Sequence, residues 1–285
     1  MDHPDDTVEM EFWYSSANAL ALDFIKEFDK YVVELGSNLD FTPRFVTWTC
    51  TACTDEFKQR ECFSSGQYCA PNHGMNSALA VEGKNVIMED LRQSCLHTQL
   101  KEEGREYLWW DYVKHVHSQC FEYIGEMCSK DGHREIKRSM DKTKQCVDQS
   151  FWKEDYASSE NTILKANDER WKEYGTLYWP SVVINRVTYR GDITAENILE
   201  VVCAALADKP NVCLNFYKEE HIVYEPPAIS AGGASVELLV VVVILLVTVN
   251  VLLICAYRRC QQKEMDEKLG MQVSSAVSHY IAVSQ

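Results

Sequence analysis

Two cysteines with two residues between them, Cys50 and Cys53, are the clearest candidates for chemistry in this sequence. Such a pair can cycle between dithiol and disulfide, can supply two zinc ligands, or can be two halves of structural disulfides. Zinc is the weakest interpretation, because Cys62 and Cys69, the next two cysteines, lack the close spacing of a second ligand pair. The structural interpretation is favoured, and the redox interpretation stays open.

Two histidines near a cysteine, His115 and His117 beside Cys120, suggest a metal at first sight. On a helix, residues two apart point to different faces, so both cannot ligate one ion. We therefore expect surface or partly buried histidines and no metal site. The sequence also lacks a Ser-His-Asp arrangement, a phosphate loop and a paired-carboxylate pattern, so we expect neither a cofactor nor an enzymatic activity.

Residues 238–256 form an uncharged apolar run in a chain of 285 residues. About 20 apolar residues cross a bilayer, so we predict one transmembrane helix. Arg258 and Arg259 follow at once, and the positive-inside rule places the C-terminal tail, 257–285, in the cytoplasm. The larger part before the span is then luminal or extracellular, a type I arrangement.

The charge is distributed unevenly about this span. There are 24 basic and 40 acidic residues before it, a net charge of −16, and four basic and three acidic residues after it. The whole chain carries −15, which argues against nucleic acid as a partner, because phosphate binding needs clustered Lys and Arg. Residues 1–6 lack the basic and apolar regions of a secretory signal, so we expect an N-terminal segment to be missing.

Ten of the twelve cysteines precede the span, and an even number in an oxidising compartment predicts up to five disulfides. Only Cys203 with Cys213 is predicted as a pair, because they flank a helix end and its loop. Cys255 and Cys260 lie at the inner membrane edge and are free or palmitoylated. The ten disulfide candidates are Cys50, Cys53, Cys62, Cys69, Cys95, Cys120, Cys128, Cys146, Cys203 and Cys213.

The hydrophobic pattern predicts a strand over 8–14, an amphipathic helix over 15–36 and a second strand over 41–49. Ser15 or Ser16 can cap the start of the helix. The order of strand, helix and strand favours a parallel α/β unit.

A helical insertion rich in disulfides is predicted from about residue 50 to 165, with helices over 86–100, 107–123 and 134–151. Within it, Trp109 and Trp110 are adjacent on one helix. We expect one of them to pack in the core and the other to cover the surface of the insertion.

A strand pair follows over 179–191, with a turn at Asn185-Arg186, and Thr194 then caps a helix. Residues 214–237 contain two prolines and two glycines in pairs and are predicted to be a stalk.

This order of elements is that of a thioredoxin-like fold, in which a cis-proline precedes the third strand, so Pro180 is the candidate by fold analogy. We predict an α/β, thioredoxin-like domain over 8–213 with a large helical insertion, followed by one transmembrane helix. Thioredoxin enzymes carry Cys-x-x-Cys where the first helix begins. Here 15–18 read Ser-Ser-Ala-Asn, so no thiolate forms there and dithiol catalysis is not expected at this site.

Several motifs resemble the plant vacuolar sorting receptors. They are FTPRFVTW (41–48), GQYCAP (66–71), LRQSC (91–95), LWWDYV (108–113) and WPSVVINRVTYRGDIT (179–194). The resemblance implies a single-span receptor of the Golgi, trans-Golgi network or prevacuolar endosome that carries soluble proteins to the vacuole. The family's protease-associated domain and EGF-like repeats have no counterpart in this sequence, so no calcium site is expected from those repeats. Cys53 is displaced relative to the family's usual second cysteine.

The tail ends in a tyrosine motif, Tyr280-Ile281-Ala282-Val283. Clathrin-adaptor medium subunits bind such segments in extended form, with one pocket for the tyrosine and another for the apolar residue. Tyr280 and Val283 are therefore the predicted sorting signal. The favoured function is a type I cargo receptor; the alternative is a membrane-anchored thioredoxin-like oxidoreductase or isomerase of the secretory pathway.

Overall fold

The computed structural model describes residues 7–70, 81–174, 178–219 and 250. The chain divides into two units, 1–223 and 224–285, and Asn250 is the one described residue of the second. The predicted tail signal, Tyr280 and Val283, and the remainder of the predicted span lie outside these residues. Among the described helices, none has the length and apolar character needed to cross a bilayer.

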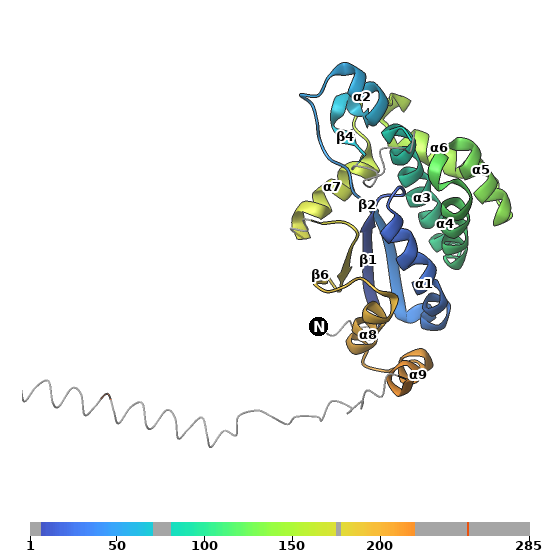
Figure 1. Ribbon diagram of the computed structural model, residues 1–285, viewed down its shortest axis with the longest axis vertical. Coiled ribbons are helices and arrows are strands. Elements are labelled where there is room, and N and C mark those ends of the chain that lie inside the picture. The colour runs from blue at the N-terminus through green and yellow to red at the C-terminus, as the bar shows by residue number, and fades with distance from the viewer. Residues whose placement is uncertain (1–6, 71–80, 175–177, 220–249, 251–285) are drawn as a thin grey trace, which may run out of the picture. The chain divides into compact units, whose positions relative to one another are not determined.

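A four-stranded sheet forms the centre of the first unit (Figure 1). β1 (Val8–Tyr14) lies parallel to β2 (Leu39–Phe45) and antiparallel to β5 (Ser181–Ile184), which pairs with β6 (Val187–Thr188). The strand order is β2-β1-β5-β6. A parallel βαβ unit followed by an antiparallel hairpin confirms the thioredoxin-like prediction.

The first helix, α1 (Ala19–Leu35), begins later than predicted. Asn18 caps it, because its side-chain oxygen accepts a hydrogen bond from the N–H of Ala21 at 3.0 Å. Ser15 and Ser16, the predicted caps, instead lie buried in the turn that connects β1 to α1.

The second strand ends at Phe45, not at residue 49 as predicted. Beyond it, the N–H of Trp48 donates to the carbonyl of Cys69 at 3.0 Å, and the N–H of Cys69 donates back at 2.8 Å. The chain thus leaves the main sheet to pair with a small hairpin. Pro43 is tolerated inside β2 because this strand is at the edge of the sheet.

The helical insertion lies between β2 and β5. Its elements are α2 (Asp55–Glu61), β3 (Cys62–Phe63), β4 (Tyr68–Cys69), α3 (Gly83–Glu102), α4 (Tyr107–Cys120), α5 (Glu126–Glu135), α6 (Asp141–Ser150) and α7 (Thr162–Tyr174). The single helix predicted over 134–151 is wrong. Lys137 has φ +56°, which ends α5, and the Ser139 hydroxyl accepts the N–H of Asp141 at 3.1 Å, which begins α6.

Both tryptophans of α4 are buried, so the prediction that one covers the surface is wrong. Their ring centroids lie 5.2 Å (Trp109) and 4.6 Å (Trp110) from that of Phe41 on β2. Trp109 also donates its indole N–H to the carbonyl of Gln93 on α3 at 3.0 Å, and Trp110 approaches Phe28 on α1 at 6.1 Å. Two adjacent faces of α4 are therefore inside the core.

The opposite face of the sheet is covered by α7. Trp13 of β1 lies 5.2 Å from Trp171, centroid to centroid. Beside it, Glu11 accepts from Arg44 at 3.1 Å and from Arg170 at 3.3 Å. Alternate residues of β1 thus pack against two layers, which explains why the strand is buried at nearly all positions.

The C-terminal end of the first unit consists of α8 (Ala195–Ala205), capped by Thr194 as predicted, and α9 (Asn211–Glu219). The predicted stalk began at 214, but α9 continues to Glu219 with Phe216 and Tyr217 buried. The folded part therefore extends beyond the predicted boundary.

Candidate functional site

The position where thioredoxin enzymes hold their dithiol is closed in this chain. Ser15 and Ser16 are 3% and 0% exposed. The N–H of Ser16 donates to Asp90 Oδ1 at 2.8 Å, and its hydroxyl donates to the carbonyl of Val86 at 3.2 Å. Because α3 supplies both acceptors, the insertion itself covers the start of α1, and this position offers neither a thiol nor an entrance.

Asp90 belongs to a buried polar network below this turn. Burial raises the pKa of its carboxyl to about 8. Its neighbour Glu89 accepts from the Tyr112 hydroxyl at 3.0 Å and from the Gln93 amide at 3.1 Å. This network was not predicted from the sequence. The signal was an acidic pair, Glu89-Asp90, inside an otherwise buried helix.

Pro180, the cis-proline candidate, follows a cis peptide bond from Trp179. The side chains before it are exposed, 78% for Tyr178 and 39% for Trp179. Ser181 then begins β5 and pairs with Trp13 of β1.

Five disulfides join all ten candidate cysteines. The pairs are Cys50–Cys53, Cys62–Cys69, Cys95–Cys146, Cys120–Cys128 and Cys203–Cys213. Four of them connect separate elements or the two strands of the β3–β4 hairpin. The Cys-x-x-Cys pair instead closes on itself.

The Cys50–Cys53 loop is half-buried and lies between β2 and α2. The N–H of Cys50 donates to the carbonyl of Gly66 at 2.8 Å. Gly66 has φ +93°, and a Cβ there would come within 2.5 Å of the Cys50 carbonyl oxygen, so only glycine fits this contact. The pair is thus attached to the β3–β4 hairpin and not to α1.

His117 is buried, which corrects the prediction of a surface or partly buried residue. Neither of its ring nitrogens has a hydrogen-bond partner, and burial lowers its pKa to about 3. His115 is partly buried on the neighbouring face of α4. Among the residues that the structure describes, no group of three or more His, Cys, Asp or Glu side chains is placed to hold a metal ion.

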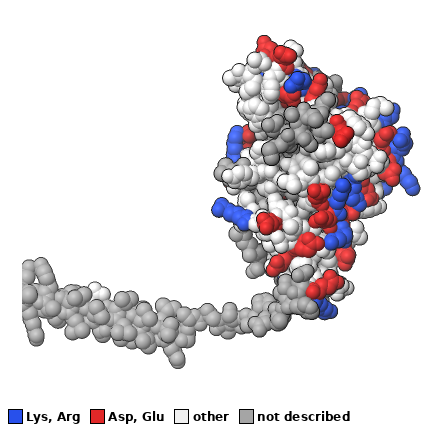
Figure 2. Space-filling view, viewed as in Figure 1, with Lys and Arg blue, Asp and Glu red and all other residues white. Residues whose placement is uncertain are grey.

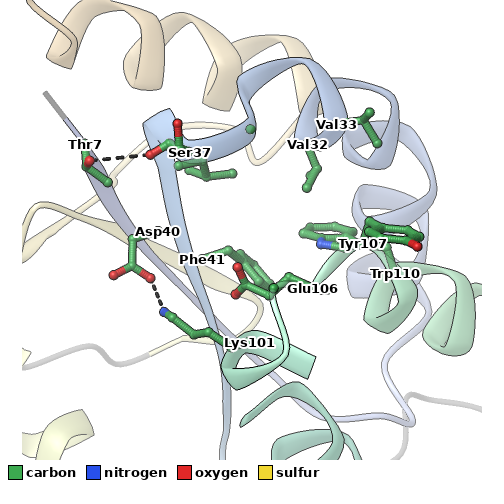
Figure 3. A pocket seen from close by; sticks show the side chains of 13 residues that line it. Thr7, Val32, Val33, Ser37, Asp40, Phe41, Lys101, Glu106, Tyr107 and Trp110 are labelled. Atoms are coloured by element: carbon green, nitrogen blue, oxygen red, sulfur yellow. Dashed lines mark hydrogen bonds and ion pairs between the residues drawn. The ribbon is translucent and has the colours of Figure 1, made fainter. Parts of the chain in front are cut away.

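An open groove of about 680 Å³ lies where α1 ends, β2 begins and α3 is followed by α4 (Figure 3). Val32 and Val33 of α1 face Tyr107 and Trp110 of α4 across it, and Phe41 of β2 lies beside the aromatic pair. Val33 is 71% exposed and Tyr107 is 50% exposed. The groove therefore presents apolar side chains to solvent, and sequence analysis did not predict it, because its walls come from distant parts of the chain.

Charged groups line one side of this groove. Asp40 of β2 forms an ion pair with Lys101 of α3 (Figure 3). Glu106 also lines it, with Oε1 3.0 Å from Nε2 of the buried His97, whose pKa is lowered by burial, while the contact with Glu106 opposes the shift. Apolar walls with a few charged groups are typical of a ligand-binding site.

Fold and site together define a thioredoxin-like domain whose dithiol position is occupied by buried serines. A family profile for the vacuolar sorting receptor thioredoxin-like domain matches residues 8–203. The chain belongs to the vacuolar sorting receptor family.

Curated relatives agree with this assignment. Vacuolar-sorting receptor 7 of Arabidopsis thaliana is 30% identical over 232 residues, and vacuolar-sorting receptor 1 of Pisum sativum is 29% identical over 232 residues. Each alignment covers 75% of this chain and 36% of the relative, so the chain spans about a third of their length. Among solved structures, the crystal structure of oxidised Mtb DsbA aligns with a TM-score of 0.41 and 10% identity, covering 77% of this chain and 94% of that one.

Proposed function

We propose that this chain is a type I membrane cargo receptor that sorts soluble proteins from the Golgi or trans-Golgi network to a vacuolar or lysosomal compartment. The domain of 8–213, extended to Glu219 by α9, lies in the lumen and binds cargo. A stalk leads from it to one transmembrane helix over 238–256, and the tail, 257–285, recruits a clathrin adaptor.

The observation that carries this proposal is the closed dithiol position in a member of this receptor family. Ser16 is fully buried, and its N–H donates a hydrogen bond to Asp90. The turn that carries the catalytic cysteines in thioredoxin enzymes therefore has a structural role here. Because one fold can host many functions, the loss of that chemistry leaves the domain free to serve in binding.

We place cargo contact in the groove of Figure 3. Its exposed Val33 and Tyr107 offer an apolar surface for a side chain of the cargo. The Asp40–Lys101 pair and Glu106 offer polar partners for a peptide backbone or side chain. Peptide ligands are commonly held by such combinations of anchor pocket and polar rim.

The test measures the binding of purified soluble vacuolar proteins to the immobilised chain by surface plasmon resonance. Val33→Glu and Tyr107→Ser should weaken binding at least about tenfold, the loss expected when a buried apolar anchor is removed. Leu20→Glu is the matched control, since Leu20 is 69% exposed on the same helix but does not line the groove. Equal binding by all four proteins would contradict the placement of the site.

The half-exposed Cys50–Cys53 disulfide favours a second candidate, a thiol–disulfide oxidoreductase. Insulin reduction and refolding of scrambled ribonuclease distinguish the two. We expect background rates for the wild-type chain. Activity that disappears in Cys50→Ser and Cys53→Ser would establish the enzyme instead.

A further inference from the structure

We infer that the folded domain has a second docking surface, a basic cleft between α5 and α6 that holds a cargo segment combining carboxylates with an apolar side chain. This inference rests on the proposed function, which makes soluble cargo the partner. The cleft is separate from the groove of Figure 3 and consists of two adjoining hollows.

The charged half of the cleft encloses about 530 Å³. Two acidic side chains line it, Glu126 and Asp141, against five cations, and this reverses the local sign in a chain of net charge −15. Blue side chains lie along the edge of the molecule in Figure 2 where Figure 1 places α5. The five cations are Lys130, Arg134, Lys137, Arg138 and Lys144.

Three of these cations are available to a ligand. Arg134 pairs with Asp131 at 3.0 Å, and Arg138 donates twice to Glu103, once at 2.9 Å. The three lysines are exposed and make no ion pair with any residue that the structure describes; they come from α5 (Lys130), from the α5–α6 turn (Lys137) and from α6 (Lys144). Three unpaired ammonium groups converging on one hollow favour an acidic ligand.

The apolar half adjoins the charged half and encloses about 320 Å³. The two hollows share Glu126, Met140 and Lys144, so they form one continuous cleft. Arg92 is buried, donates to the Ser129 hydroxyl at 3.1 Å and pairs with Glu89 at 3.6 Å, and Asp148 also lines this half, so the unpaired positive charge of the cleft comes from the lysines. The apolar walls are Phe63, Met88, Met140, Val147 and Tyr156.

The combination selects a class of ligand. A free anion, a nucleic acid or an anionic membrane would use the lysines but would leave the apolar hollow empty. A peptide with carboxylates on either side of a large apolar residue fills both halves, and the net negative charge of the chain disfavours acidic segments at its acidic surfaces.

The experiment uses fluorescence anisotropy with the chain and a short labelled peptide that has leucine and phenylalanine between glutamates. Lys137→Glu combined with Lys144→Glu should weaken binding at least about tenfold. Lys26→Glu combined with Lys218→Glu changes the net charge equally, away from the cleft, and should leave binding within about twofold of wild type. Binding unaffected by the cleft substitutions, or lost equally in both variants, would overturn the inference.

Two further arms separate the ligand class and the function. A peptide with serines in place of leucine and phenylalanine should bind several-fold more weakly. Equal binding, or an equal affinity for phosphatidylserine vesicles, would mean that charge alone is recognised and would contradict the inference. If no soluble vacuolar protein binds the wild-type chain, the proposed function fails; if cargo binds wild type and the cleft variant equally, only the assignment of cargo to this cleft fails.

Discussion

Ser16 and Asp90 determine what the start of α1 can do. The backbone N–H that would steady a thiolate in a thioredoxin enzyme is instead bonded to a carboxyl group from α3. Asp90 Oδ2 has no hydrogen-bond partner, and burial raises the pKa of the group to about 8, so the carboxyl is neutral at and below neutral pH. The sequence alone indicated the loss of the cysteines, but the closure depends on a residue more than 70 positions away.

Replacement of Asp90 by asparagine should change the pH dependence of stability. A carboxyl has a pKa of about 3.9 when unfolded, and that of Asp90 is about 8 when folded, so between these values the unfolded chain binds fewer protons. The free energy of unfolding therefore falls with rising pH, by up to about 1.4 kcal/mol per unit from this group. Asp90→Asn should remove that component, which urea unfolding at pH 5 and pH 7.5 measures. Equal pH dependence in both proteins would contradict the assignment.

His117 should give the free energy of unfolding the opposite pH dependence. Burial lowers its pKa to about 3, whereas an unfolded histidine titrates near 6.5. The unfolded chain therefore binds the extra proton as pH falls below about 6.5, and stability is lost on acidification. Since neither ring nitrogen has a partner, His117→Phe should reduce this loss, as measured by thermal unfolding between pH 7 and pH 4.5. His115→Gln, at a partly buried position on α4, is the control, and a similar change in both variants would contradict the argument.

At the level of elements, the strongly patterned segments were predictable. β1 has the predicted bounds, and α4 begins at the predicted residue, because each is rich in the apolar and aromatic residues that its pattern requires. The division of residues 134–151 between α5 and α6 was not predictable in that way. It depends on the left-handed conformation of Lys137, which the residue type does not favour. α2 and α7 were missed because their apolar faces are short and their anchors, a disulfide hairpin and Trp13, are distant in sequence.

The disulfides should differ in their contribution to stability. Cys95–Cys146 joins α3 to α6 across 51 positions, whereas Cys50–Cys53 spans three. Chain-entropy arguments assign about 4 kcal/mol to the long loop and about 2 kcal/mol to the short one. Replacing both cysteines of each pair by alanine and measuring denaturant midpoints tests this order. A larger loss from Cys50→Ala with Cys53→Ala would show that the short loop organises the β3–β4 hairpin more strongly than loop closure alone accounts for.

At the level of the whole molecule, the proposed receptor combines the folded domain with a tail that lies outside the described residues. The groove could not be predicted from sequence, because α1, β2 and the connection between α3 and α4 meet only in the fold. The charged half of the basic cleft comes from residues 126–144 alone, but its apolar half also needs Phe63, Met88 and Tyr156, which are distant from one another in sequence. The tail motif, in contrast, stays a prediction from sequence, which can propose it because an extended segment with two anchors needs no fold to be recognised.

The most direct test of the central claim is the fraction of a soluble vacuolar protein that is secreted by cells lacking this chain. The account predicts increased secretion, full rescue by wild type and by Cys50→Ala with Cys53→Ala, and failed rescue by Tyr280→Ala. This outcome would mean that the chain carries cargo through its tail signal without dithiol chemistry. Correct delivery in the absence of the chain, or rescue that requires Cys50 and Cys53, would contradict it.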